Sequence, residues 1–392
     1  MTGPAPERSG TFFQRFLLPA FALKGIIIGG GYATGRELAE YFLSQGPVGS
    51  LLALALAMLF WAVIAAMTFA LAHQAKAYDY RSFIANLLGR GAIVFELCFL
   101  FFSVLLLAVF GAAAGEVGAS LFPIPAWVGT LALAIAIAAI ASFGERAVET
   151  MFKYVSTFLY AVYALFLVLA LTSFGDRIGD TLAAGGIEPG WPVSGLTYGI
   201  YNIVCAIMIL PVLRHFTSRR DAVIAGVIAG PMAMLPALAF LIAMIGFYPV
   251  ILDQTLPSDY ILQRLGSPAF RFAFQIMVFC ALLESSVGVI HALNERVITW
   301  REGRADAGPT PGWLRPGLTV SVLAGCMFAA NRIGLVDLIA SGYRLLAIIF
   351  LLTFVLPLLT IGVVKLVRAP SEPRRTTGPD ASGPERTQDH HA

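Results

Sequence analysis

The sequence contains little charge. Of its 392 residues only 12% are Asp, Glu, Lys or Arg, whereas 58% are hydrophobic. Soluble domains carry about 25% charged residues, because charge covers their water-facing surface. The composition therefore excludes an ordinary soluble globular protein. Since each helical crossing of a bilayer needs about 20 apolar residues, the sequence instead predicts an all-α integral membrane protein with short tails and no sizeable soluble domain.

Cysteine and the common catalytic motifs are also scarce. The four cysteines lie singly in apolar runs, without CxxC or His spacing, which indicates reduced packing residues rather than a disulfide or metal framework. The sequence has no HExxH or GxSxG motif and no Asp/His set with ligand spacing, so we expect neither enzymatic activity nor a resident cofactor. No filter repeat of a channel is present. A net charge of +3 points to no nucleic-acid partner.

About ten apolar segments follow one another, separated by short loops rich in Gly and Pro. We expect a transmembrane domain at residues 13–368, preceded by a cytoplasmic tail at 1–12 that shows no signal-peptide cleavage pattern. A disordered cytoplasmic tail is expected at 369–392, which is rich in Pro, Ser, Gly and charge. The ten segments are residues 13–42, 49–75, 93–121, 127–142, 155–173, 195–213, 222–247, 269–300, 314–330 and 342–367.

The distribution of Lys and Arg predicts the orientation of these segments. Most of the 26 basic residues fall in the tails and in alternate loops, whereas the opposite loops hold only Arg177, Arg264, Arg271 and Arg332. Cytoplasmic loops carry the excess of positive charge. We therefore expect both termini on the cytoplasmic side of a bacterial inner membrane. The lipid bilayer is one expected partner, and the sequence leaves the oligomeric state open.

The first segment contains an unusual run of glycine. Gly29, Gly30 and Gly31 are consecutive, and a fourth glycine, Gly35, directly precedes Arg36. Each glycine disfavours a helix by about 1 kcal/mol, and unwound backbone at bilayer depth is tolerated where it is buried in protein or lines a cavity. The run predicts a broken helix at a binding site. The alternative is close helix packing through the GxxxG pair at positions 31 and 35.

The sixth segment shows a matching irregularity. Tyr198, Tyr201 and Asn202 place polar groups near its start, and Pro211 interrupts its far end. Segments one and six hold equivalent positions in two sets of five, at residues 13–173 and 195–367. Because five is an odd number of crossings, the second set starts on the opposite side of the membrane and runs inverted relative to the first. Paired broken helices in such inverted repeats indicate a solute site at the midplane.

The eighth segment adds further polar groups. Adjacent hydroxyls at Ser285 and Ser286 suit a monovalent cation beside an unwound carbonyl, although helix serines also bond back to the preceding turn. Glu284 should face the protein interior, where it pairs or carries a proton. His291 follows toward the cytoplasm. The phenylalanines, including Phe99 and Phe102, are interpreted as lipid-facing or core residues.

Residues 29–37, 201–202 and 284–296 resemble the YkvI-like membrane proteins, a bacterial family related to the amino acid–polyamine–organocation superfamily. The resemblance extends over residues 13–367 and implies the LeuT-like fold of two inverted five-helix repeats, with helices one and six broken. Many members of this family have Gln where this sequence has Arg36.

The resemblance also implies roles for individual residues. By analogy with sodium-coupled LeuT-like transporters, the predicted ion site comprises Gly25, Ile28, Leu282, Ser285 and Ser286. The predicted solute site comprises Gly29, Gly30, Gly31, Tyr32, Thr34, Tyr198, Tyr201 and Asn202. Coupling or gating residues are predicted at Arg36, Glu37, Glu284 and His291.

These features predict a secondary active transporter that couples a cation, preferably Na⁺, to symport of a small solute such as an amino acid or related zwitterion. Only Lys24 and Arg36 bring positive charge near the first break, so a multiply charged anion would be poorly compensated. Two alternatives remain open. One is proton coupling through Glu284, and the other is a membrane sensor that kept the fold without transporting.

Overall fold

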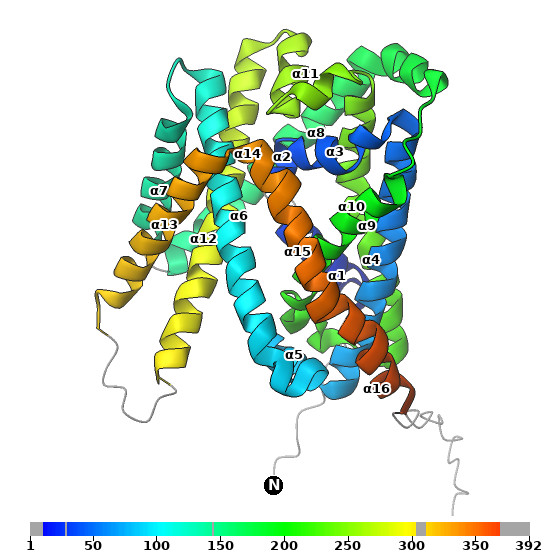
Figure 1. Cartoon of the computed structure of the whole chain (residues 1–392), viewed down its shortest axis with the longest axis vertical. Helices are drawn as coiled ribbons and strands as arrows, with labels where there is room; N and C mark the ends of the chain where they lie inside the picture. The colour runs from blue at the N-terminus through cyan, green and yellow to red at the C-terminus, as the bar shows by residue number, and fades with distance from the viewer. Residues whose placement is uncertain (1–10, 28–29, 143–144, 303–310, 369–392) are drawn as a thin grey trace, which may run out of the picture.

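The computed structural model describes residues 11–27, 30–142, 145–302 and 311–368, and every regular element within them is a helix. The longer helices stand side by side as a bundle, with α5 and α16 at one end, called the N-terminal end below, and α11 at the other (Figure 1). The longer helices are α4 (Pro47–Ala75), α6 (Ala92–Leu121), α7 (Ala126–Ser142), α8 (Glu145–Ala184), α9 (Trp191–Ile203), α10 (Arg219–Ile245), α12 (Pro268–Glu302) and α13 (Leu314–Ile333).

Shorter elements connect or continue the long helices. The short α-helices are α1 (Leu18–Ile27), α2 (Gly30–Ala33), α3 (Arg36–Tyr41), α5 (Tyr80–Leu88), α11 (Pro257–Leu265), α14 (Leu335–Asp337), α15 (Tyr343–Phe350) and α16 (Val363–Arg368). The 3₁₀ turns are η2 (Leu43–Gln45), η3 (Gly89–Gly91), η4 (Val204–Ile207), η5 (Leu210–His215) and η6 (Val250–Asp253), and the π-helical turns are η1 (Phe13–Leu17), η7 (Leu338–Gly342), η8 (Leu351–Val355) and η9 (Leu358–Gly362).

Six helical runs in the described part of the chain are long and apolar enough to cross a membrane. They are Pro47–Ala75, Tyr80–Leu121, Phe158–Ala184, Arg219–Ile245, Pro268–Ile298 and Leu335–Arg368. The other four predicted segments correspond to α7, to α13, to the short elements at residues 13–42, and to α9 with the turns η4 and η5 that follow it. The prediction of an all-α multi-pass membrane protein is confirmed, while the count of ten crossings stays a prediction. The predicted tails fall, apart from residues 11 and 12, outside the described residues.

Helices α4 and α10 pack with their backbones almost touching. A Cβ atom added at Gly226 of α10 would lie 2.3 Å from Cα of Ala66, and one at Gly230 would lie 2.5 Å from the amide nitrogen of Ala62. No side chain fits in such a gap, and small residues permit this approach between membrane helices. The pair of glycines therefore fixes α10 directly against α4.

Several helical stretches were not predicted from the sequence, among them α5, α11 and the end of α8. The short helices α5 and α11 bury one face only, so neither contains a long apolar run. The side chain of Asp79 caps α5 by accepting a hydrogen bond from the amide of Ser82 at 2.9 Å. Helix α8 continues to Ala184, past the predicted end at residue 173, with a non-helical residue at Phe174. Each of these stretches contains polar residues at short intervals, so none forms an apolar run long enough to be predicted as a crossing.

Candidate functional site

Residues 13–42 do not form one continuous helix. Helix α1 ends at Ile27, α2 ends at Ala33, and α3 begins at Arg36. Gly35 between α2 and α3 has a φ of +78°, a conformation that costs glycine nothing and strains other residues. A Cβ atom at Gly35 would also lie 2.8 Å from Cζ of Phe240. Backbone conformation and close packing therefore both require glycine at this position.

The sixth predicted segment also changes character along its length. Helix α9 ends at Ile203 and is followed by the 3₁₀ turns η4 and η5, with Pro211 in the first turn of η5. Tyr198, Tyr201 and Asn202 lie within α9, one or two turns before the change. The first and sixth segments thus both lose regular α-helix, and their irregular portions are brought together with α6, α12 and α15 around one cavity.

This central cavity has a volume of about 430 Å³. That size lies within the range of small-molecule sites, roughly 300–1,000 Å³. Its walls come from α1, α2, α3, α6, α8, α9, η4, α12 and α15. The lining residues are Gly25, Ile26, Ile27, Tyr32, Glu37, Phe99, Phe102, Ser103, Leu106, Phe110, Leu159, Tyr160, Tyr201, Asn202, Cys205, Met208, Glu284, Ser285, Gly288, Val289, Ala292 and Tyr343.

All three predicted motifs reach the central cavity. Seven of the residues singled out in the sequence are among its lining: Gly25, Tyr32, Glu37, Tyr201, Asn202, Glu284 and Ser285. They come from α1, α2, α3, α9 and α12, which are far apart in the sequence. The convergence of these motifs makes this cavity the candidate solute site.

The remaining predicted residues lie elsewhere. Thr34, Leu282 and Ser286 are buried but do not line the cavity, and the Ser286 Oγ has no hydrogen-bond partner within the described part of the chain. His291 is exposed on α12. Ile28 and Gly29 lie outside the described residues, and residues 30–31 open α2.

Tyr198 belongs to an aromatic cluster next to the cavity wall. Its ring lies 4.6 Å from that of Phe42 and 6.0 Å from that of Trp61, measured between centroids. Its hydroxyl is buried and lacks a partner among the described residues. Tyr198 therefore supports the neighbouring Tyr201, whose ring centroid is 5.5 Å away, instead of lining the cavity itself.

Arg36 points away from the cavity toward the end of the bundle that carries α11. Its Nη1 donates to the carbonyl oxygens of Leu252 at 2.7 Å and Gln254 at 3.1 Å, and its Nη2 donates to Glu40 Oε2 at 2.8 Å. The guanidinium thus ties α3 to the loop around η6. This arrangement holds the adjacent Glu37 in place while keeping the positive charge of Arg36 engaged elsewhere.

Glu37 brings a carboxylate to the cavity wall. The side chain is 7% exposed, and its Oε2 accepts a hydrogen bond of 2.8 Å from the hydroxyl of Tyr201. The ring of Tyr343 lies 4.6 Å from that of Tyr201, between centroids. These three residues link α3, α9 and α15, so the first, sixth and last predicted segments meet at one polar cluster.

The aromatic wall of the cavity was not predicted from the sequence. Phe99, Phe102 and Phe110 of α6 line it, together with Tyr160 and Tyr343. The phenylalanines were interpreted as lipid-facing or core residues, because nothing in a uniformly apolar helix marks the side that faces a cavity. Tyr343 offered a weak signal, since it is a polar aromatic residue beside Arg344 within an apolar run.

Ion pairs hold the bundle together at both ends. At the N-terminal end, Arg15 Nη2 lies 2.5 Å from Asp221 Oδ2, an atom that also accepts from the Thr217 hydroxyl at 2.7 Å. At the opposite end, Arg271 Nε lies 2.7 Å from Asp259 Oδ1. The first pair joins the start of the chain to α10, and the second joins α11 to α12.

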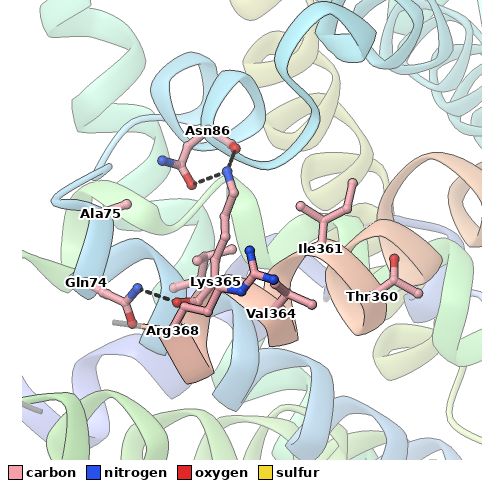
Figure 2. Close-up of a pocket in the computed structure, with 9 residues that line it drawn as sticks. Gln74, Ala75, Asn86, Thr360, Ile361, Val364, Lys365 and Arg368 are labelled. Carbon is pink, nitrogen blue, oxygen red and sulfur yellow. Dashed lines mark hydrogen bonds between the residues drawn. The ribbon is translucent and has the colours of Figure 1, made fainter. Parts of the chain in front are cut away.

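A second hollow, larger at about 770 Å³, lies between α4, α5 and the last helical run. Figure 2 shows Lys365 reaching the backbone and side-chain oxygens of Asn86, while Gln74 Nε2 donates to the Lys365 carbonyl at 3.0 Å. None of the predicted site residues lines it. We therefore take the smaller central cavity as the candidate site.

Known proteins resemble this chain in sequence and in fold. No known family model matches the sequence. The uncharacterized membrane protein YkvI of Bacillus subtilis (strain 168) is 22% identical over 282 residues, which cover 71% of this chain and 80% of YkvI. The predicted resemblance to the YkvI-like proteins is confirmed.

The structure of MhsT in complex with L-phenylalanine is similar over nearly the whole chain. It covers 93% of this chain and 98% of MhsT, with 15% sequence identity and a TM-score of 0.60. MhsT is a LeuT-fold transporter. This chain shares that LeuT fold. The chain is thus a multi-pass membrane protein that resembles YkvI in sequence and MhsT in fold.

Proposed function

We propose that this LeuT-fold protein is a secondary active transporter that couples a cation, Na⁺ in the first instance, to symport of a small solute such as an amino acid. The observation that carries the proposal is the cavity of about 430 Å³ at the point where both irregular segments meet. Sites for solutes in transporters of inverted-repeat folds are formed by such discontinuous helices. MhsT, which shares the fold, binds L-phenylalanine.

The proposed architecture has two inverted repeats of five crossings, at residues 13–173 and 195–367. Elements α1, α2 and α3 correspond to broken helix one of this arrangement, and α9, η4 and η5 correspond to broken helix six. The excess of Lys and Arg at the N-terminal end of the bundle supports a cytoplasmic location for both termini. We place the protein in the bacterial inner membrane on these grounds.

The proposed cation site lies beside the solute cavity and takes its ligands from the first predicted segment and from α12. Gly25 and Ser285 line the cavity, and Leu282 and Ser286, on the same helix as Ser285, are buried. The Ser286 Oγ lacks a partner in the described part of the chain, although a helix serine normally bonds back to the preceding turn. A buried hydroxyl without a partner is costly, and a Na⁺ ion would satisfy it. The carbonyl of Ile28, outside the described residues, completes the proposed ligand set.

The function is tested first by ligand binding and then by flux. The detergent-purified protein is screened for melting temperature against amino acids and related metabolites, with NaCl or KCl as the only salt. A ligand that binds only the folded state raises the melting temperature by mass action. Compounds that stabilise the protein are then followed into proteoliposomes with an imposed Na⁺ or H⁺ gradient.

Uptake of a stabilising compound that requires the Na⁺ gradient supports the whole proposal. Uptake that follows an H⁺ gradient and ignores Na⁺ overturns the assignment of the ion and favours proton coupling through Glu284. Binding without any flux, in vesicles where a reference transporter works, overturns transport and favours a sensor on the same fold.

A further inference from the structure

The charged side chains that line the central cavity are all acidic. Glu37 and Glu284 are among the residues that line it, from α3 and from α12. None of the lining residues in the described part of the chain is Lys, Arg or His. Lys24 packs on the ring of Tyr160, with its Nζ 4.7 Å from the centroid, but is not itself part of the lining. The cavity is therefore an acidic site.

Glu37 retains capacity to bind a positive group. Its one described hydrogen bond comes from Tyr201, whereas an ionised carboxylate offers about four acceptor positions. No Lys or Arg of the described residues lies within 4.0 Å of it, since Arg36 pairs with Glu40 instead. A buried carboxylate is costly unless it is paired and hydrogen-bonded. A cation in the cavity would supply the missing partner.

The walls around Glu37 suit an organic cation rather than a bare metal ion. The rings of Tyr201 and Tyr343 lie next to the carboxylate, tilted by 37° to each other, and the hydroxyl of Tyr343 is buried without a partner in the described chain. Phe99, Phe102 and Phe110 form an apolar wall on α6. Aromatic faces attract cations, and an ammonium group beside them is stabilised further when water is excluded. Apolar rings also accommodate a hydrocarbon body.

We propose that the transported solute carries a protonated amine on an apolar body, and that Glu37 binds this amine against the rings of Tyr201 and Tyr343. The inference rests on the proposed function, because it names the solute class of the same cavity. It excludes anions and uncharged compounds as the main substrates. Glu37 is then a residue that determines specificity, with Tyr201 orienting its carboxylate.

The test uses three probes of one shape on the full-length, detergent-purified protein. Phenethylamine carries the ammonium group, 2-phenylethanol replaces that group by a hydroxyl, and 3-phenylpropanoate carries a carboxylate. We expect phenethylamine to raise the melting temperature, with no shift from the other two at equal concentration. Equal or larger shifts from 2-phenylethanol or 3-phenylpropanoate would overturn the inference, and so would the absence of any shift with phenethylamine. This comparison needs no variant.

A pair of variants then assigns the effect to one carboxylate. We expect Glu37→Gln to weaken phenethylamine binding about tenfold or more, the usual effect of losing a charge-assisted hydrogen bond. Glu116→Gln is the matched control, because Glu116 is a partly buried carboxylate of α6 that does not line the cavity. Undiminished binding to Glu37→Gln would overturn the role of Glu37.

Failure of this inference and failure of the proposed function give different results. If phenethylamine does not bind but another compound of the library is taken up into proteoliposomes, transport stands and the amine assignment is wrong. If phenethylamine binds through Glu37 but no stabilising compound is ever taken up, the site is right and the transport function is wrong.

Discussion

The hydroxyl of Tyr201 donates a hydrogen bond of 2.8 Å to Glu37, a residue 164 positions away in the sequence. This contact joins α3 to α9, so it links the two segments that the sequence marks as irregular. A solute bound at Glu37 would touch both halves of the chain at once. The contact therefore offers a direct way for solute binding to favour one arrangement of these segments over another.

Replacing Tyr201 by Phe tests this contact. The substitution removes the donor and leaves the ring, so Glu37 loses its described partner. We expect solute binding to weaken about tenfold, because hydrogen bonds to charged groups contribute roughly 1.5–3 kcal/mol. Titration of the solute by calorimetry measures the change. Tyr198→Phe is the control, since the Tyr198 hydroxyl has no partner among the described residues. An equal loss in both variants would contradict a specific role for Tyr201.

The double variant Ser285→Ala, Ser286→Ala tests the proposed cation site. Both hydroxyls are removed with little change in volume, so we expect half-maximal stimulation of uptake to need at least several-fold more Na⁺. The measurement is uptake into proteoliposomes as a function of Na⁺ concentration. Ser321→Ala serves as the control, because that hydroxyl bonds to the carbonyl of Gly317 at 2.8 Å. An unchanged Na⁺ dependence in the double variant would defeat the assignment.

Gly288→Leu should block the cavity without unfolding the protein. Gly288 lines the cavity, and a Cβ atom there would have no heavy atom within 4 Å. A leucine side chain can therefore occupy the space that the solute needs. We expect solute binding to be lost while the melting temperature of the solute-free protein stays within a few degrees of the original. Gly325→Leu is the comparison, since Gly325 of α13 also has open space but lies outside the lining. Solute binding that survives in Gly288→Leu would move the site elsewhere.

Arg15→Gln tests the ion pair at the N-terminal end of the bundle. Loss of one partner leaves the buried carboxylate of Asp221 short of a positive charge. This change costs about 3–5 kcal/mol for a fully buried pair and less here, because the Arg15 side chain is 27% exposed. We expect this end to open more often, exposing Cys205 in the cavity. The readout is the rate of maleimide labelling of Cys205 in a variant whose other three cysteines are alanine.

Labelling should rise several-fold in Arg15→Gln and fall again when solute is added. Arg332→Gln is a suitable control, because Arg332 is exposed at the end of α13 and takes part in no ion pair within the described residues. An identical labelling rate with and without Arg15 would show that this pair does not keep the cavity closed.

Much of the site could be predicted from the sequence, because polar residues and glycines are rare in apolar segments. The glycine-rich run at residues 29–37, the Tyr201-Asn202 pair and Glu284-Ser285 each stand out against such a background. Tyr32 and Glu37 of the first, and both members of the other two, line one cavity. The physical reason is that a polar group or unwound backbone is costly in lipid, so its position reports a site in the protein interior.

The remaining features could not be predicted, for equally physical reasons. Phe99 and Phe102 look like any apolar residue in a membrane helix, and only packing decides that they face the cavity. Arg36 looked like part of the site because it lies beside the glycine run. Its length lets it reach carbonyls at Leu252 and Gln254, two positions over 200 residues away, and no local pattern encodes that contact.

The near contact of α4 with α10 limits how the protein can change shape. With Gly226 facing Ala66 and Gly230 facing Ala62 at these distances, sliding one helix along the other would drive side chains of either into the opposite backbone. Helices α4 and α10 must therefore move together as one rigid body. The proposed transport function requires a hinge that opens the cavity to alternate sides. The short elements around Gly35 and η4 are suited to that hinge, because they contain few residues and little regular structure to break.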